Sequence, residues 1–244
     1  MTILEKVSAQ KLVMVALLLL MVYPLAIIAA RLEIWHFRNS FLLFIVAALL
    51  GFGVFAMSLL KLSKGEKADS NALLVALGAT VLPLAIMGSH VYKAQSSPFI
   101  HDISTDIIHA PQLNAAAQVR LESDHGVEYL AAQVSKKQKV GYPELTSLTL
   151  SQDPQTVFSA AKQIMAAQGW AMMAENKHEL PYTLEASDTS LLFGFTDDVV
   201  LRIQLAGSGS LVDMRSMSRV GQSDMGKNAQ RIGEFFNELT LALK

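Results

Sequence analysis

Four arginines near the end of the chain have the chemistry of an anion site. Three lie on two consecutive predicted strands and one lies in a predicted helix, with acidic and amide side chains around them: Arg202, Arg215, Arg219 and Arg231 with Asp198, Asp213, Asp224 and Asn228. Guanidinium groups bind carboxylates and phosphates through paired hydrogen bonds. The set predicts four converging arginines, forming either a site for an external anion or a closed salt-bridge network, and we favour the network.

Two strands must position the first three arginines. Apolar and polar residues alternate along 198–205 and again along 211–219, which is typical of strands with one buried face. The letters GSGS at 207–210 predict a tight turn between them. The stretch therefore predicts a β-hairpin with one polar face.

A two-residue turn at Ser208 and Gly209 would place Arg202 directly opposite Arg215. Like charges in directly opposed positions destabilise a sheet. This register therefore requires an anion beside the pair, and Asp213, Glu185 and an external anion are the candidates.

A helix is expected after the second strand, with Ser223 or Asp224 as its cap. Apolar residues then recur at helical spacing, and we expect Phe236 to lie in the core. Arg231 lies in the first turns of this helix, where a cation opposes the helix dipole. It therefore needs a carboxylate close by.

The stretches DDVVLRI, DMRSMSRVGQSDMGKNAQRI, IHDISTD and GW resemble the family catalogued as domain of unknown function 1499, over roughly residues 97–243. The segment at Pro111 matches less closely, because the family usually has paired prolines there. Asp102 and Thr105 match the family pattern, and the resemblance implies that they anchor their segment to the domain by hydrogen bonds. The family has no established activity, so the resemblance implies no catalytic residue.

Three long apolar stretches precede this region. They cover about 12–30, 41–60 and 72–91, and no ionisable residue interrupts their cores. Each is long enough, or nearly so, to cross a bilayer of about 30 Å. We therefore expect a membrane region at 1–96 with three transmembrane helices, and an extramembrane domain at 97–244.

The basic residues flanking these stretches predict the orientation. Five lie on the side of the N-terminus and three on the other: Lys6, Lys11, Lys61, Lys64 and Lys67 against Arg31, Arg38 and Lys93. Cytoplasmic loops are enriched in lysine and arginine. We therefore expect a multi-pass protein of the cell inner membrane with a cytoplasmic N-terminus and a periplasmic C-terminal domain.

The extramembrane domain is predicted to be α+β. A weak strand at 145–150, a helix starting after Asp153 and ending at Gly169, and strands at 170–175 and 182–189 precede the hairpin and the last helix. The order β-α-β-β-β-β-α indicates an antiparallel meander with two helices on one face.

The apolar residues of 191–195 occupy a predicted loop. We expect this loop to fold under and seal the core, and the alternative is an exposed lip that touches lipid or a partner.

Composition and motifs exclude several classes of function for the extramembrane domain. The domain has 12 lysines and arginines against 17 aspartates and glutamates, a net charge of −5, which excludes a nucleic-acid partner. Neither a nucleophile elbow nor a zinc, P-loop or dinucleotide motif occurs. We therefore expect no catalytic residue, no metal and no cofactor.

Three functions remain open, and binding is favoured over catalysis. The first is a binding or scaffold module for an envelope protein or lipid, with the lipid bilayer as a further partner. The second is an enzyme or binding protein that recognises an anionic envelope substrate through the arginine-rich sheet face. The third is an assembly factor of a membrane complex.

Overall fold

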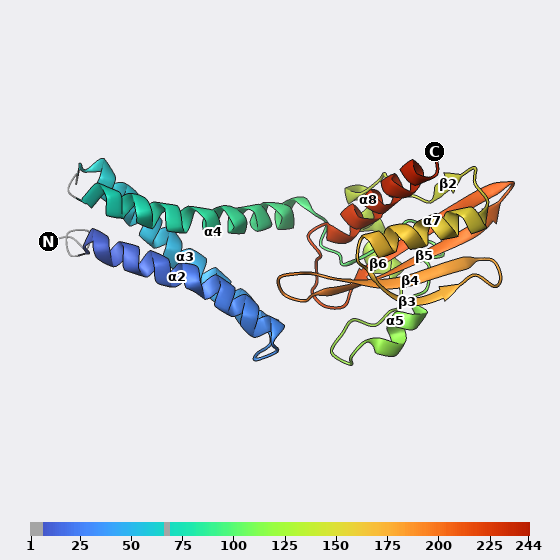
Figure 1. Cartoon of the computed structure of the whole chain (residues 1–244), viewed down its shortest axis with the longest axis horizontal. Helices are drawn as coiled ribbons and strands as arrows, with labels where there is room; N and C mark the ends of the chain where they lie inside the picture. The colour runs from blue at the N-terminus through green and yellow to red at the C-terminus, as the bar shows by residue number, and fades with distance from the viewer. Residues whose placement is uncertain (1–6, 66–68) are drawn as a thin grey trace. The chain divides into compact units, whose positions relative to one another are not determined.

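The computed structural model describes residues 7–65 and 69–244 (Figure 1). The chain forms two compact units. One contains the helices up to Tyr92 together with Leu191–Gly194, and the other contains Lys93–Ser190 and Phe195–Lys244. Lys6 and Lys67, which contribute to the charge count, lie outside the described residues.

Three long helices make up most of the first unit: α2 (Ala9–Arg31), α3 (Phe37–Ser63) and α4 (Ser70–Ser96). Their length and composition suffice to cross a membrane. Pro24 and Pro83 lie inside helices. The three expected apolar helices are therefore present, and each extends several residues beyond its apolar stretch.

The second unit is built on a six-stranded antiparallel sheet in which β1, β6, β5, β4 and β3 follow one another, and β2 pairs with β6. The strands are β1 (Asp102–Ser104), β2 (Leu148–Leu150), β3 (Ala171–Asn176), β4 (Tyr182–Thr189), β5 (Thr196–Ala206) and β6 (Gly209–Ser218). Strands β3 to β6 form the predicted meander, and the predicted α+β class is confirmed.

Two helices cover one face of this sheet, α7 (Pro154–Ala167) and α8 (Lys227–Ala242) (Figure 1). Asp153 caps α7 by accepting hydrogen bonds from the backbone N–H groups of Gln155 and Thr156, as its position before Pro154 predicts. The apolar faces of both helices and of the strands form one core.

The last helix presents a different phenylalanine to the core from the one expected. Phe235 is fully buried and its ring stacks on that of Trp170, with 5.6 Å between centroids. Phe236 is only partly buried at the edge of the core. The expectation that Phe236 is the core residue is therefore wrong, because α8 is rotated so that its neighbour points inward.

The hairpin has a different register from the one expected. Ala206 pairs with Gly209, so the turn consists of Gly207 and Ser208, and Gly207 adopts the left-handed conformation with φ of 61°. Consequently Arg202 pairs with Asp213, and the predicted opposition of Arg202 and Arg215 is wrong.

Close packing explains why Gly209, the third letter of that turn signal, belongs to strand β6. A side chain on Gly209 would collide with the backbone carbonyl of Leu150 in β2. Gly209 is therefore required by the approach of β2, not by the turn. The true register differs from the expected one by two residues, and such a shift keeps every side chain on its predicted face.

The loop between β4 and β5 does not seal the core. Leu191 is 83% exposed and Leu192 is 52% exposed, and neither belongs to the core cluster. The expectation that these leucines fold under the domain is wrong.

Candidate functional site

The sheet face turned away from α7 and α8 is covered by the segment 105–130, which we call the cover segment. It contains the short helix α5 (Asn114–Val119), which lies on the opposite side of the sheet from α7 and α8 (Figure 1). Leu113 and Ala116 of this segment pack on Val200 and Met217 of the sheet, and all four are buried. The polar face predicted for β5 and β6 is therefore largely enclosed.

Arg202 joins the sheet to the cover segment. Its Nη2 donates to Asp213 at 2.8 Å and to Asp106 at 2.9 Å. Its Nη1 donates to the carbonyl of His109 at 2.7 Å. One guanidinium thus has two carboxylate partners, one on the neighbouring strand and one on the cover segment.

Arg215 is fully buried. Its Nε and Nη2 donate to the two carboxylate oxygens of Asp102, each at 2.9 Å, and its guanidinium lies 5.2 Å from the centroid of the Tyr129 ring. Backbone carbonyls of Pro111 and Val127 accept its remaining hydrogen bonds, at 3.2 and 2.8 Å. A buried charge is tolerated when it is paired and its hydrogen bonds are satisfied, as here.

Arg219 shares its carboxylate partner with an arginine that the sequence reasoning did not identify. Arg219 donates to Asp198 at 2.8 Å, and Arg120 of the cover segment donates to the same carboxylate at 2.7 Å. Asp198 itself is 0% exposed. The sequence contained one indication of a special role for Arg120, since it is the only arginine between residues 97 and 201.

Arg231 belongs to α8 and lies on the other face of the sheet. It donates to Asp188 at 2.6 Å and Asp197 at 2.7 Å, and also to Ser216 and Asn228. The predicted convergence of all four arginines is therefore wrong, because α8 packs on the face opposite to the other three. The expected need of Arg231 for a carboxylate is met.

Asn228 and Asp224 have structural roles in the same region. Asn228 accepts from Ser216 at 2.7 Å, and its amide donates to Ser218 and to the carbonyl of His101, each at 3.0 Å. Asp224 pairs with no arginine in the described chain. Instead it accepts from the backbone N–H groups of Gly226 and Asn228, each at 2.9 Å, and burial raises its pKa above the ordinary value.

The anchoring residues implied by the family resemblance lie at the edge of the sheet. Thr105 donates to Asp213 at 3.2 Å and accepts from the backbone N–H of Met214 at 3.0 Å. Asp102 pairs with Arg215, as described above.

Glu185 has a different role from the one considered for it. It accepts hydrogen bonds from the backbone N–H groups of Ala115 and Ala116, at 2.9 and 2.7 Å, and so caps α5 instead of neutralising an arginine.

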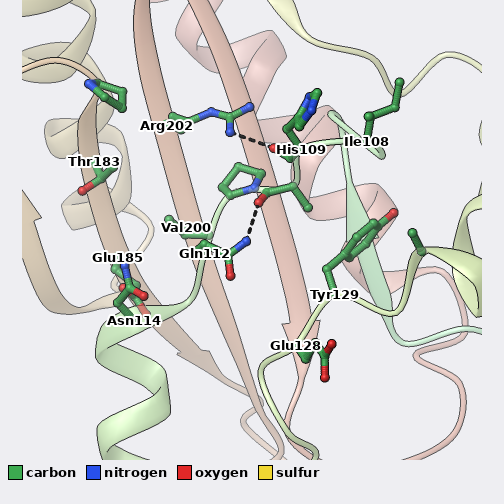
Figure 2. A pocket seen from close by; sticks show the side chains of 14 residues that line it. Ile108, His109, Gln112, Asn114, Glu128, Tyr129, Thr183, Glu185, Val200 and Arg202 are labelled. Atoms are coloured by element: carbon green, nitrogen blue, oxygen red, sulfur yellow. Dashed lines mark hydrogen bonds between the residues drawn. The ribbon is translucent and has the colours of Figure 1, made fainter.

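A pocket of about 600 Å³ opens between the cover segment and strands β4 and β5 (Figure 2). Ala110, Pro111 and Val200 form apolar parts of its wall. Figure 2 shows Arg202 beside His109 at one end and Glu128 near Tyr129 at the other. Its volume lies in the range typical of small-molecule sites.

The charges around this pocket are predominantly negative. Glu128 and Glu185 line it together with Arg202, and the positive charge of Arg202 is already matched by Asp106 and Asp213. Glu128 is exposed to solvent at the pocket. The Nε atom of Arg202 is buried and has no hydrogen-bond partner among the described residues. The pocket thus has carboxylate acceptors, an aromatic ring and apolar walls.

Comparison with known protein families identifies a matching family. The family described as protein of unknown function (DUF1499) matches residues 102–239, which include the sheet, the cover segment and the pocket. No curated protein matches the sequence.

Proposed function

The chain belongs to the DUF1499 family of unknown function, and we propose that it is a membrane-anchored binding protein whose α+β unit holds a small ligand in the pocket beneath the cover segment. The observation that supports this proposal is the pocket itself, which is enclosed by two strands and by a segment held in place through ionic hydrogen bonds. The arginines then serve to fix the pocket wall, not to bind the ligand.

The arrangement of the arginines supports this division of roles. Arg202 holds the backbone of His109, which lines the pocket, and Arg215 holds the backbone of Pro111, which lines it too. Each guanidinium also has carboxylate partners within the protein. An external anion would have to displace these carboxylates, at the cost of stranding buried negative charge.

The ligand class follows from the charges that remain. The two glutamates disfavour an anion, because the charge of Arg202 is already matched by Asp106 and Asp213. A neutral or cationic group finds an acceptor in the exposed Glu128. The apolar wall suits a ring or a short hydrocarbon chain. We therefore propose a neutral or cationic small molecule with an apolar body as the ligand, in place of the anionic substrate considered from the sequence.

The proposed location follows from the loop charges. Five basic residues on the N-terminal side against three on the other support a cytoplasmic N-terminus, and three spans then bring the α+β unit to the opposite side. With this proposed orientation, the pocket would lie at the periplasmic face of the inner membrane in a bacterium with two membranes.

Three fluorescent probes with one common ring system test the proposal: dansylcadaverine is cationic, dansylamide is neutral and dansylglycine is anionic. Each is titrated against the full chain in lipid nanodiscs. The variant Ala131→Trp, at the start of helix α6 (Ala131–Gly141), fills the pocket from its rim. Ala132→Trp on the same helix, whose side chain does not line the pocket, is the matched control. The probe partitions into the nanodisc lipid equally in all samples, so this contribution cancels when the fluorescence of a variant is subtracted from that of the wild type.

We expect dansylcadaverine and dansylamide to bind the wild type and Ala132→Trp, and Ala131→Trp to bind at least about tenfold more weakly. Dansylglycine should bind more weakly than the other two. Glu128→Gln should weaken the cationic probe about two- to fivefold and leave the neutral probe unchanged, because an exposed ion pair contributes little. Equal binding by wild type and Ala131→Trp, or preference for the anionic probe, would overturn the proposal.

A further inference from the structure

We propose that one end of the α+β unit contacts the bilayer surface, and that the exposed leucines of the β4–β5 loop, Leu191 and Leu192, insert into the headgroup region. The proposed contact surface does not include the pocket, and the inference does not depend on the pocket binding a ligand.

The exposure of the two leucines is the first observation. Leu191 is 83% and Leu192 is 52% exposed, and they are consecutive residues. A single exposed leucine is ordinary in a soluble protein, but adjacent exposed apolar residues at a loop tip are typical of surfaces that meet a membrane or a partner. Two further observations identify the bilayer as the partner.

The strand register shows where this loop lies relative to the point at which the chain enters the sheet. Asp102, Met217, Asp198 and Ser187 pair across β1, β6, β5 and β4 in one row. The β4–β5 loop begins three residues beyond Ser187, at the same end at which the chain enters β1. With about 4.8 Å between neighbouring strands, the loop is laterally about 10–15 Å from β1.

The connection to the last membrane helix is short. Helix α4 ends at Ser96, and Ile100 is already buried in the core of the α+β unit, with its carbonyl accepting a hydrogen bond from the backbone N–H of Asp224 at 3.1 Å. Only three residues separate them, so the link spans at most about 14 Å. A link this short keeps the entry of the chain into the sheet, at the end that carries the two leucines, close to the end of α4.

A third apolar side chain is exposed at this end. Phe99, within the link itself, is 61% exposed although it directly precedes the buried Ile100. Aromatic side chains are favoured at the interface between hydrocarbon and water. The link therefore contributes one exposed apolar side chain, Phe99, and the β4–β5 loop contributes two, Leu191 and Leu192. All three belong to the end of the sheet at which the chain enters β1.

Site-specific fluorescence in vesicles tests the inference. The chain has no cysteine, so one introduced cysteine can be labelled uniquely with the environment-sensitive dye NBD. Leu191→Cys reports on the loop, and Leu205→Cys is the matched control, an exposed leucine (59%) near the β5–β6 turn at the opposite end of the sheet. Both full-length variants are reconstituted in phosphatidylcholine and phosphatidylglycerol, with and without lipids that carry a doxyl quencher near the headgroup.

We expect NBD at position 191 to be blue-shifted and quenched by the doxyl lipids at least about threefold more strongly than NBD at position 205. The double variant Leu192→Ser in the Leu191→Cys background should reduce this quenching. Equal quenching at the two positions would overturn the inference. A blue shift at position 191 without doxyl quenching would overturn it as well, because the loop would then be covered by protein.

Discussion

Asp102 accepts two parallel hydrogen bonds from Arg215, each 2.9 Å long, although the two residues are 113 positions apart in the chain. Asp102 begins the first strand after the membrane helices, and Arg215 lies in the adjacent strand β6. Both side chains are almost completely buried. The pair therefore fastens strand β1 to strand β6, and removal of either partner leaves an uncompensated charge.

Arg215→Met should lower the free energy of unfolding of the α+β unit by about 3–5 kcal/mol, because Asp102 then remains buried without its cation. Lys162→Met is the control, since its salt bridge with Glu175 is about half exposed on both sides, and it should cost less than about 1 kcal/mol. Urea titration of the full chain in detergent, followed by the fluorescence of the buried Trp170, measures both. Adding Asp102→Asn to Arg215→Met should restore part of the loss, and equal costs for Arg215→Met and Lys162→Met would contradict the assigned role.

Asp106→Asn should destabilise the protein at neutral pH and lose this effect in acid. Burial acts to raise the pKa of Asp106, but hydrogen bonds from the N–H groups of His109 and Ile108 and from Arg202 outweigh it, so its pKa lies below the ordinary 3.8. A carboxyl with a lowered pKa stabilises the fold above pH 3.8, and this contribution is lost as pH falls through the folded-state pKa.

Asparagine retains the oxygen that accepts both backbone hydrogen bonds, and it replaces the charged oxygen that accepts from Arg202 with an uncharged NH2 group. Urea midpoints of the wild type and Asp106→Asn, measured from pH 7 down to pH 3, should therefore converge on the acid side. A difference that stays constant over this range would show that the charge of Asp106 makes no contribution.

Phe235→Ala should cost about 3–5 kcal/mol, whereas Phe236→Ala should cost at least about 1 kcal/mol less. Phe235 is 0% exposed and stacks on Trp170, while Phe236 is only partly buried. The two substitutions remove the same atoms from consecutive positions of α8, so each is the control for the other. The opposite order in urea titrations would mean that α8 is rotated by about one residue from the orientation described here.

Alkaline phosphatase, which is active only outside the cytoplasm, should be active when fused after Lys244 and inactive when fused after Gly65. The first position follows three membrane spans and the second follows two, starting from a cytoplasmic N-terminus. Enzyme activity normalised to the amount of fusion protein gives the measurement. Activity in the Gly65 fusion together with inactivity in the Lys244 fusion would invert the proposed orientation.

The sequence by itself determined the elements whose signals are local. Three stretches without Asp, Glu, Lys or Arg predicted α2, α3 and α4, because a helix with no polar face is stable only in lipid or in a core. Alternation predicted β4, β5 and β6, and Asp153 with Pro154 predicted the start of α7. Each of these signals depends only on neighbours within a few residues, so a single sequence suffices to read it.

Only the tertiary structure decided how these elements pair and which charges meet. A shift of the β5–β6 hairpin by two residues preserves the alternation of faces, so the pattern is compatible with both registers. The approach of Leu150 to Gly209 selects the register in which Arg202 meets Asp213. Asp102 and Asp106, which pair with Arg215 and Arg202, and Arg120, which shares Asp198 with Arg219, lie in a part of the chain that has no periodicity and is distant in sequence. Tertiary packing brings the cover segment over the sheet to form the pocket.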